Sequence, residues 1–379
     1  MSQLTSISAL VSQRAASSGS ETIMRTKNRG IWKAVTWEQL EAQVRAIGTA
    51  LLASGFGRGD AMAIVSETRP EAAYADLAIL GCGAASVAIN PDGDADRVRN
   101  ILSSTGSRLV FVENEEQLDK ILTIRGHCPA LSHIVVFDMK GLRDFSDAGC
   151  ISLAAFAKTG GAADWTASVK AIEASQPAVI QFPRGESTGS GETITHGDVM
   201  QALGAARTHL AIYKNDERLA VLHLADITER VWGLYLALDS GCISNYPEAP
   251  DTVIENLQEL QPTVLGADAV VWNHLHTLAT ARAAAATSTQ RLAYEWALRA
   301  GNRGGPMRLL AGLLVLHAVR REFGLNRLHV AYSGGASVSP RTLNWAASLG
   351  VEIQRLDDPG KGGGRFDERR RNQVQNPSA

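Results

Sequence analysis

The chain has 379 residues, of which 45% are hydrophobic, so it can bury a sizeable core and is long enough for two or three subdomains. Its 37 Lys and Arg residues balance 39 Asp and Glu residues to a net charge of −2, which argues against a nucleic-acid or other polyanionic partner. Its four cysteines form no CxxC pair and no apolar run reaches the ~18 residues of a membrane span, so neither a disulfide framework, a zinc knuckle nor a transmembrane segment is indicated.

Residues 1–20 are expected to form an N-terminal extension, and they lack the basic-then-apolar pattern of a signal peptide. Helical and strand patterns alternate from about Thr36 onward, which is typical of an α/β protein. Thr36 is a natural N-cap, an apolar stripe at helical spacing follows it, and "SGFGRGD" ends that helix. The next stretches, "AMAIVSE" and "RPEAAYADLAILGCGA", predict a buried strand and a second helix.

Further strands are expected at "ASVAIN", "RLVFVE", "HIVVFD", "AVIQF", "RLAVLHL", "CISNY", "TVLGA", "LHVAYS" and "VEIQRL". The alanine-rich stretch "TLATARAAAATSTQRLAYEWALRAG" predicts helical structure, and "LLAGLLVLHAV" predicts a buried helix. A small, polar stretch near residue 160 suggests two α/β subdomains, at 21–160 and 161–355. The Gly- and Arg-rich tail, 356–379, holds almost nothing apolar and is expected to be disordered.

The loop "FPRGESTGSGETITH", from Phe182 to His196, follows a predicted strand and allows three interpretations. It resembles a phosphate-cradling loop, but it has no lysine, and Glu192 stands where a cation is wanted. Gly185 to Gly189 also satisfies the G-x-S-x-G nucleophile elbow, although the helix is expected to begin several residues too late for that motif. On composition alone, a flexible solvent loop is the favoured interpretation of these residues.

Two other motifs also have structural explanations. His196 falls at a predicted helix start, where a structural polar role is commoner than catalysis. His274 and His276 are two residues apart and point to different faces of a helix, which argues against a pair of metal ligands. The glycines of "SGGAS", residues 333–337, would let a ligand approach the backbone closely, but they also suit a simple tight turn.

Several segments, in their order along the chain, resemble the AMP-forming acyl-CoA synthetases, and most closely the long-chain fatty-acid–CoA ligases. They include "GIWKAVTWEQL", "GRGDAMAIVSETRPEAAYADLAILGCGAASVAIN", "LADITERVWGLYLALDSGCISNYPEAP" and "EFGLNRLHVAYSGGASVSP". The resemblance covers about residues 22–354. It implies an α/β fold, the large N-terminal domain of an adenylate-forming enzyme with stacked mixed sheets flanked by helices, incomplete here and without the C-terminal lid.

The resemblance also implies a two-step reaction. A carboxylate attacks the α-phosphate of ATP, with Mg²⁺ neutralising charge, and CoA then displaces AMP from the acyl-adenylate. The phosphate loop of the family, which reads like TSGTTG-x-PKG before a Thr/Ser-His pair, aligns with the Phe182 loop. The positions carried over as nucleotide-binding candidates are Gly185, Ser187, Thr188, Gly189, Thr195, His196, Gly334, Gly335 and Ala336. The acyl-site candidates are Asp226 and Trp232, within a stretch that matches the family's "LPLAHxxER".

The sequence departs from the family pattern in three places, so no catalytic residue and no metal site is assigned. The loop has lost its Pro-Lys pair and gained Glu186 and Glu192, and Asp226 replaces the usual His or Trp. After "LGVEIQ", the expected Tyr, Gly, Thr and Glu align with Asp357, Asp358, Gly360 and Lys361. Losing one transition-state contact costs about 10²–10³ in rate, so we expect a long-chain fatty-acid–CoA ligase relative with impaired catalysis.

Two alternatives stay open: a non-catalytic acyl- or nucleotide-binding module, and the inert product of a degraded or frame-altered gene. The expected small-molecule partners are a fatty acid or other carboxylic acid and CoA. A partner chain or second copy is expected over the sheet edge that the incomplete domain leaves uncovered. The cysteine usage favours a cytoplasmic location, and we expect peripheral contact with the membrane.

Overall fold

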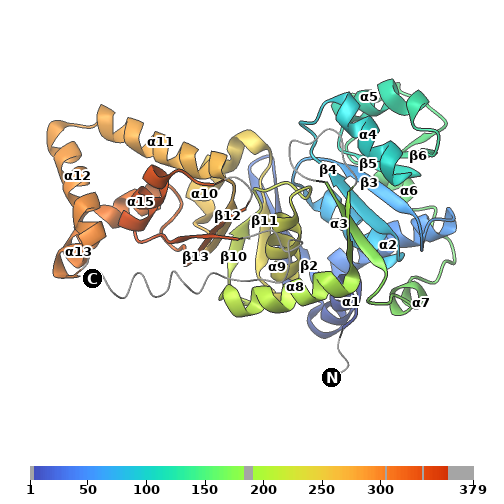
Figure 1. Cartoon of the computed structure of the whole chain (residues 1–379), viewed down its shortest axis with the longest axis horizontal. Coiled ribbons are helices and arrows are strands. Elements are labelled where there is room, and N and C mark those ends of the chain that lie inside the picture. The colour runs from blue at the N-terminus through green and yellow to red at the C-terminus, as the bar shows by residue number, and fades with distance from the viewer. Residues whose placement is uncertain (1–3, 183–190, 304, 335–336, 357–379) are drawn as a thin grey trace.

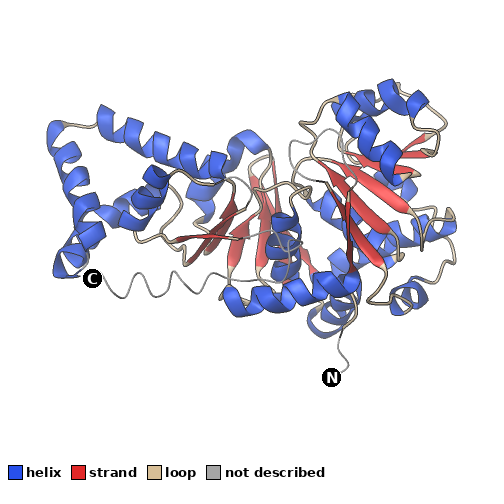
Figure 2. Ribbon diagram, viewed as in Figure 1, coloured by secondary structure: helices blue, strands red, loops and turns tan. Residues whose placement is uncertain are grey.

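The computed structural model describes residues 4–182, 191–303, 305–334 and 337–356. Within these ranges, two mixed β-sheets lie side by side and helices pack on their faces (Figure 1, Figure 2). This is the α/β arrangement of sheets flanked by helices that the sequence predicts. The described residues include no helix long and apolar enough to cross a membrane.

The first sheet is built from residues 61–195. Its strands follow the order β7-β6-β5-β3-β4-β8-β9 and are parallel, except for the antiparallel β8–β9 hairpin at one edge. Helices cover both faces, so β3 and β5 are buried along their whole length, as near-continuous apolar strands of parallel sheets are. The strand bounds are β3 Ala61–Val65, β4 Ala85–Ile89, β5 Leu109–Val112, β6 His133–Val136, β7 Cys150–Ser152, β8 Pro177–Gln181 and β9 Glu192–Thr195.

The second sheet combines the start of the chain with its later strands. Strand β1 joins the later strands because it pairs with β11. The strand order is β14-β13-β12-β10-β11-β1-β2, and all neighbours are parallel except in the β1–β2 hairpin. The bounds are β1 Thr22–Asn28, β2 Ile31–Thr36, β10 Glu217–Leu219, β11 Ile243–Tyr246, β12 Val264–Ala267, β13 Val330–Ser333 and β14 Ile353–Arg355.

The helices fill the connections between strands. Thr36 caps α2 with a capping box, as its position predicts. The bounds are α1 Ile7–Ser18, α2 Trp37–Ala53, α3 Pro70–Gly81, α4 Ala95–Thr105, α5 Glu115–Ile124, η1 Arg125–His127, α6 Leu153–Phe156, α7 Trp165–Lys170, α8 His196–His209, π-helix η2 Glu229–Tyr235, α9 Leu236–Ser240, η3 Pro250–Thr252, α10 Val253–Leu260, α11 Ala269–Ala285, α12 Ser288–Arg303, α13 Gly305–Ala311, π-helix η4 Gly312–Leu316, α14 His317–Glu322 and α15 Pro340–Ser348.

The two sheets do not divide the chain at residue 160, where the sequence suggests a boundary between 21–160 and 161–355. Strands β1 and β2 join the later strands, while β8 and β9 extend the first sheet. The polar stretch around 160 is a crossover between strands of one sheet. Trp165 anchors this crossover in the core, because its ring fills the space beside two glycines: a Cβ on Gly48 or Gly81 would lie 2.1 or 2.0 Å from it.

Residues 1–20 are also more than an extension. Helix α1 buries Ile7, Leu10 and Val11, and Ser8 Oγ donates a hydrogen bond to the carbonyl oxygen of Leu77 at 3.0 Å. Of the predicted tail 356–379, only Leu356 lies within the described residues, and it is buried.

One helix prediction is confirmed with a break in the middle, and one is wrong in part. The alanine-rich stretch is helical and is divided into α11 and α12, because Thr287 and Gln290 form a new N-terminal cap: each backbone N–H donates to the other side chain. The stretch Leu309–Val319 is helical but not buried, since Leu309, Leu313 and Leu314 are exposed.

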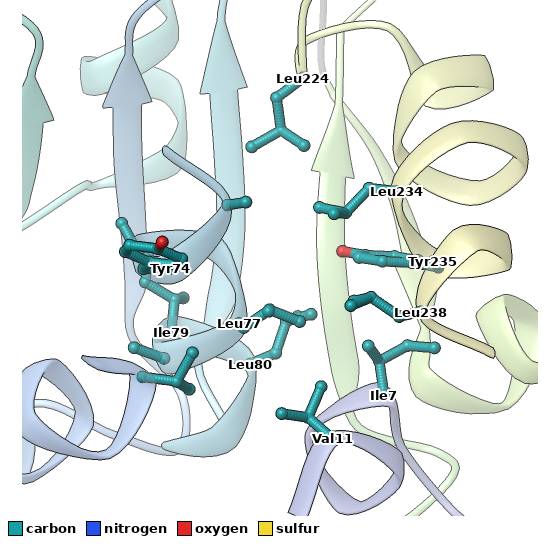
Figure 3. Close-up of a cluster of buried hydrophobic side chains, with 14 of the residues drawn as sticks. Ile7, Val11, Tyr74, Leu77, Ile79, Leu80, Leu224, Leu234, Tyr235 and Leu238 are labelled. Atoms are coloured by element: carbon teal, nitrogen blue, oxygen red, sulfur yellow. The ribbon is translucent and has the colours of Figure 1, made fainter. Parts of the chain in front are cut away.

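The largest hydrophobic cluster joins the two sheets. It combines α1 and α3 with residues from η2 and α9. Figure 3 shows Leu77 and Leu80 of α3 facing Leu234 and Leu238. Tyr235 lies between Leu234 and Leu238, and Ile7 lies below Leu238. The shared core holds the carboxyl ends of strands from both sheets near each other.

Candidate functional site

Residues 222–228, between β10 and η2, lie where the two sheets meet, and we call them the junction segment. Gln181, the last residue of β8, donates through Nε2 to the carbonyl oxygen of Ala225 at 2.8 Å. Thr68, between β3 and α3, donates through Oγ1 to the carbonyl oxygen of Leu222 at 2.7 Å. These contacts come from beyond the carboxyl ends of parallel strands, the side on which α/β proteins place their ligands.

The turn after β13 closes on the same segment. A Cβ added to Gly334 would lie 2.7 Å from Thr228 Oγ1, so only glycine allows this approach without a shift. The neighbouring Ser333 hydroxyl is buried and has no hydrogen-bond partner among the described residues. Gly334 therefore lies beside the junction segment, whereas Gly335 and Ala336 fall outside the described residues.

Asp226 has a clear structural role in the junction segment. Its side chain is 7% exposed, and its Oδ1 accepts a hydrogen bond from the backbone N–H of Thr228 at 2.9 Å. Its own carbonyl oxygen accepts from the N–H of Arg230 at 3.0 Å, where the helical turns leading into η2 begin. Asp is among the best N-cap residues, so the acid at this position stabilises the start of the helix.

Trp232 lies inside η2, and its indole is 6% exposed with no hydrogen-bond partner for Nε1 among the described residues. Its carbonyl oxygen accepts from Tyr332 Oη at 3.2 Å, which links η2 to β13. A Cβ on Gly233 would meet Glu229 Oε2 at 2.3 Å, so glycine leaves room there for the Glu229 carboxylate. Short π-helices of this kind are frequent at functional sites.

A buried polar cluster that sequence reasoning missed fixes η2 against the first sheet. Arg230 and Asp76 are both 0% exposed, and Nη2 lies 3.2 Å from Oδ1. The Asp76 carboxylate also accepts from Ser86 Oγ at 2.6 Å and from Tyr235 Oη at 2.6 Å. Burial, and secondly Asp76, raise the pKa of Tyr235 well above its usual value. The signal in the sequence is the charged pair "ER" that opens the apolar stretch "VWGLYLAL".

A second buried ion pair joins η2 to the second sheet. Arg218 of β10 donates through Nη2 to Glu229 Oε1, and both side chains are nearly inaccessible. Burial raises the pKa of Glu229, and the Arg218 guanidinium offsets part of that effect. The two pairs, Arg218 with Glu229 and Arg230 with Asp76, thus hold one helix between two sheets.

The β8–β9 hairpin carries the loop that resembles a phosphate loop. Gly185, Ser187, Thr188 and Gly189 lie outside the described residues. Gln181 pairs with Glu192 at the loop end of the hairpin, and Pro177 pairs with Thr195 at the other end. Four strand residues span about 13 Å, so Thr195 and His196 lie far from the end at which Gln181 reaches the junction segment.

Thr195 and His196 act on the local structure of α8. Thr195 Oγ1 accepts from the N–H of Asp198, and Asp198 Oδ2 accepts from the Thr195 N–H at 2.9 Å, which makes a capping box. The His196 side chain is 1% exposed, and its Nε2 has no hydrogen-bond partner among the described residues. Burial lowers the pKa of His196 to about 4, so the imidazole is neutral near pH 7.

The electrostatics beside the junction segment are dominated by acids. Burial, with Glu113 as the next cause, raises the pKa of Glu67 to about 7. His223 Nδ1 lies 3.3 Å from Glu67 Oε2. Within the ranges that the structure describes, no group of three His, Cys, Asp or Glu side chains is placed to hold a metal ion.

The sequence matches the AMP-binding enzyme family over residues 11–356. It is 27% identical over 343 residues to the long-chain-fatty-acid–CoA ligase FadD15 of Mycobacterium bovis, which covers 86% of this chain and 55% of FadD15. It is 23% identical over 363 residues to the long-chain-fatty-acid–CoA ligase ACSBG2 of Rattus norvegicus, 89% of this chain and 54% of that protein. The chain thus spans about half the length of the curated relatives it matches.

A solved structure shares the fold. The A domain of a carboxylic acid reductase from Segniliparus rugosus, in complex with AMP and a co-purified carboxylic acid, matches with a TM-score of 0.70 and 17% identity. The match covers 92% of this chain and 59% of that domain's chain, which confirms the predicted architecture. Because the family match extends over most of the sequence, this chain belongs to the AMP-binding enzyme family.

Proposed function

We propose that the chain is a long-chain acyl-CoA ligase relative that binds a carboxylic acid or its adenylate and has impaired turnover. The relatives named as long-chain-fatty-acid–CoA ligases support the substrate class. The reductase domain that contains AMP and a carboxylic acid supports an adenylate site in this fold. The observation that carries the impairment is Asp226: a buried carboxylate binds the backbone N–H of Thr228, whose side chain lies against Gly334, at a position where the family usually has His or Trp.

The co-substrates of the complete reaction are ATP with Mg²⁺, and CoA. The sequence from Pro183 to Thr195 contains Glu186 and Glu192, no lysine, and Arg184 as its one cationic residue. A phosphate loop needs positive charge because negative charge builds up on the transferring group. We therefore assign this chain binding and orientation of the acyl-adenylate.

Asp226 opposes that binding through its charge, and a pair of variants separates the charge from the helix cap. Asp226→Asn keeps a good N-cap and removes the charge, whereas Asp226→Ala removes both. We expect calorimetry with a non-hydrolysable palmitoyl-adenylate analogue to show about tenfold tighter binding by Asp226→Asn than by the wild type. Equal affinities would contradict the assigned role of this carboxylate.

A second measurement tests turnover. Purified chain with ATP, Mg²⁺, palmitic acid and CoA should release little pyrophosphate and little palmitoyl-CoA. Binding of the adenylate analogue without turnover supports the proposal. No binding at all would favour the inert-gene-product alternative, and sustained formation of both products would show that catalysis is intact.

For location, we propose a cytoplasmic protein that contacts the membrane peripherally, because long-chain fatty acids partition into bilayers. A partner chain or second copy over the edge strand β14 stays a prediction. Size-exclusion chromatography with light scattering tests it, and a monomer at all concentrations would contradict it.

A further inference from the structure

An exposed apolar surface covers the part of the molecule farthest from the first sheet. Leu309, Leu313 and Leu314 are 72%, 82% and 65% exposed. Met307 and Leu310 beside them are 48% and 45% exposed, and we call these five residues the leucine tip. They make up half of the ten large hydrophobic side chains that are exposed in the described part of the chain. Such clustering marks a contact surface rather than scattered surface residues.

The spacing places the leucines on one helical face. Leu309 and Leu313, like Leu310 and Leu314, are four residues apart and lie above one another along α13 and η4. Ala311 and Leu316 are buried, so the opposite face packs on the body of the protein. Figure 1 shows α12 and α13, in orange, at one end of the long axis and remote from the two-sheet junction. The leucine tip is therefore outside the candidate site.

Positive charge surrounds the leucine tip. From Trp296 to Arg321 the sequence has no Asp or Glu and contains five arginines, of which Arg299 is paired with Glu295 and Arg320 donates to backbone carbonyl oxygens. Arg303, Arg308 and Arg321 are exposed. Arg308 also contributes, after burial, to a lowered pKa of Arg320, because the two guanidinium groups are close to each other. The nearest acid along the chain, Glu322, is paired with Arg282.

The composition favours a lipid surface over a protein. The cores of protein interfaces are enriched in aromatic residues as well as in Met and Arg, and the leucine tip contains no aromatic residue. Exposed leucines beside arginines are typical of helices that lie in the membrane interface and insert their apolar side to the level of the acyl chains. The described helices are too short or too polar to span a bilayer, which suits contact from one side.

We propose that the leucine tip docks the protein onto an anionic lipid bilayer, with the leucines inserted at the acyl boundary and the arginines contacting lipid phosphates. This inference deepens the peripheral location given under the proposed function. Docking would place the protein at the lipid bilayer, into which long-chain fatty acids partition. Docking needs neither nucleotide nor turnover, so it stands or falls independently of catalysis.

Vesicle flotation tests the docking without ATP, fatty acid or CoA. The wild type should float with vesicles of phosphatidylglycerol and phosphatidylcholine, and should bind less to pure phosphatidylcholine and at raised salt. Leu309→Ser with Leu313→Ser should weaken binding by at least about tenfold. Arg303→Ser with Arg308→Ser should weaken binding to the anionic vesicles by roughly fivefold per arginine and have little effect on neutral ones.

The matched control is Ile31→Ser with Val270→Ser, which removes two exposed apolar side chains, 66% and 74% exposed, from other parts of the surface. The control should bind vesicles like the wild type, and all variants should keep the wild-type circular dichroism. Equal floating of the leucine variant and the wild type would overturn the proposal. A wild-type dimer that becomes monomeric in the leucine variant, with no vesicle binding by either, would also overturn it and would assign the surface to a second copy.

Discussion

The helix η2 and the β8–β9 hairpin both face the point where the two sheets meet, but they differ in what surrounds their charges. At η2, Arg230 lies against Asp76, and Arg218 binds Glu229, all of them buried. The hairpin carries a loop whose sequence has gained two acids and lost its lysine. The charges at η2 are thus matched inside the fold, whereas the loop that we propose to meet a phosphate has Arg184 against Glu186 and Glu192 in its sequence.

From this difference we infer that the residues that stabilise the fold are separate from the residues that would bind the nucleotide. A buried carboxylate without its cation destabilises the fold by several kcal/mol, so the η2 pairs are tied to folding itself. Acids in a surface loop cost the fold little. A chain can therefore keep the architecture of its family while its nucleotide loop changes.

The strongest way to break this comparison is to remove one buried charge. Arg230→Met leaves Asp76 without its cation in a buried site and should lower the free energy of unfolding by about 3–5 kcal/mol. Urea unfolding followed by circular dichroism measures this change. Adding Asp76→Asn should recover part of the loss, because the uncompensated charge is then gone.

The control for that prediction is Arg299→Met, which breaks an ion pair with Glu295 in which the side chains are 66% and 49% exposed. It should change the stability little, since solvent screens an exposed pair. Similar losses for Arg230→Met and Arg299→Met would contradict the structural importance of the η2 cluster.

Lowering the pH tests the burial of His196, which directly follows strand β9 of the hairpin. The folded-state pKa of His196 lies near 4 against an ordinary value of 6.5, so the unfolded chain binds the extra proton between these values. The free energy of unfolding is therefore unaffected by this proton above pH 6.5. It decreases as the pH falls below 6.5, and at pH 4 the decrease is about 3 kcal/mol. His196→Met should remove this part of the pH dependence in urea unfolding, while His274→Met, at an exposed site, should keep it.

The cap on the junction segment gives a smaller effect. Asp226→Ala should lower the unfolding free energy by about 1 kcal/mol, because the Thr228 N–H loses its acceptor, and Asp226→Asn should be close to neutral. Thermal denaturation of the two variants side by side measures the difference. An equal loss in both would mean that the charge, rather than the cap, stabilises this turn.

The smallest expected effect concerns the contact between hairpin and junction. Gln181→Leu removes the hydrogen bond to the Ala225 carbonyl oxygen and should cost roughly 0.5 kcal/mol. We expect hydrogen exchange to increase in residues 222–228 and not in β3. Unchanged exchange in the junction segment would show that the hairpin does not restrain it.

Local patterns predicted much of the fold from the sequence. The cap at Thr36, the apolar runs of β3 to β6 and the start of α8 depend on residues close together in the chain. The division of strands between the sheets could not be predicted in the same way, because β1 pairs with β11 across more than half of the chain. Long-range pairing leaves no local periodicity to read.

The site was predictable only in part, for the same reason. Asp226, Trp232 and Gly334 follow from motif position, and the structure brings Gly334 and the Asp226 turn together at Thr228. The family motif also predicted Thr195 and His196 as site residues. In the structure, the Thr195 side chain forms the capping box of α8, and the His196 side chain is buried at the first residue of that helix. The Asp76–Arg230 pair joins residues 154 positions apart and needed the fold to be seen.

The most direct test of the account is the formation of acyl-adenylate by the purified chain. With ATP, Mg²⁺ and palmitic acid, pyrophosphate release should stay at the level of a no-enzyme control, while a palmitoyl-adenylate analogue still binds in calorimetry. Sustained pyrophosphate release that depends on palmitic acid would contradict the central claim that this chain keeps the scaffold and has lost the phosphate chemistry.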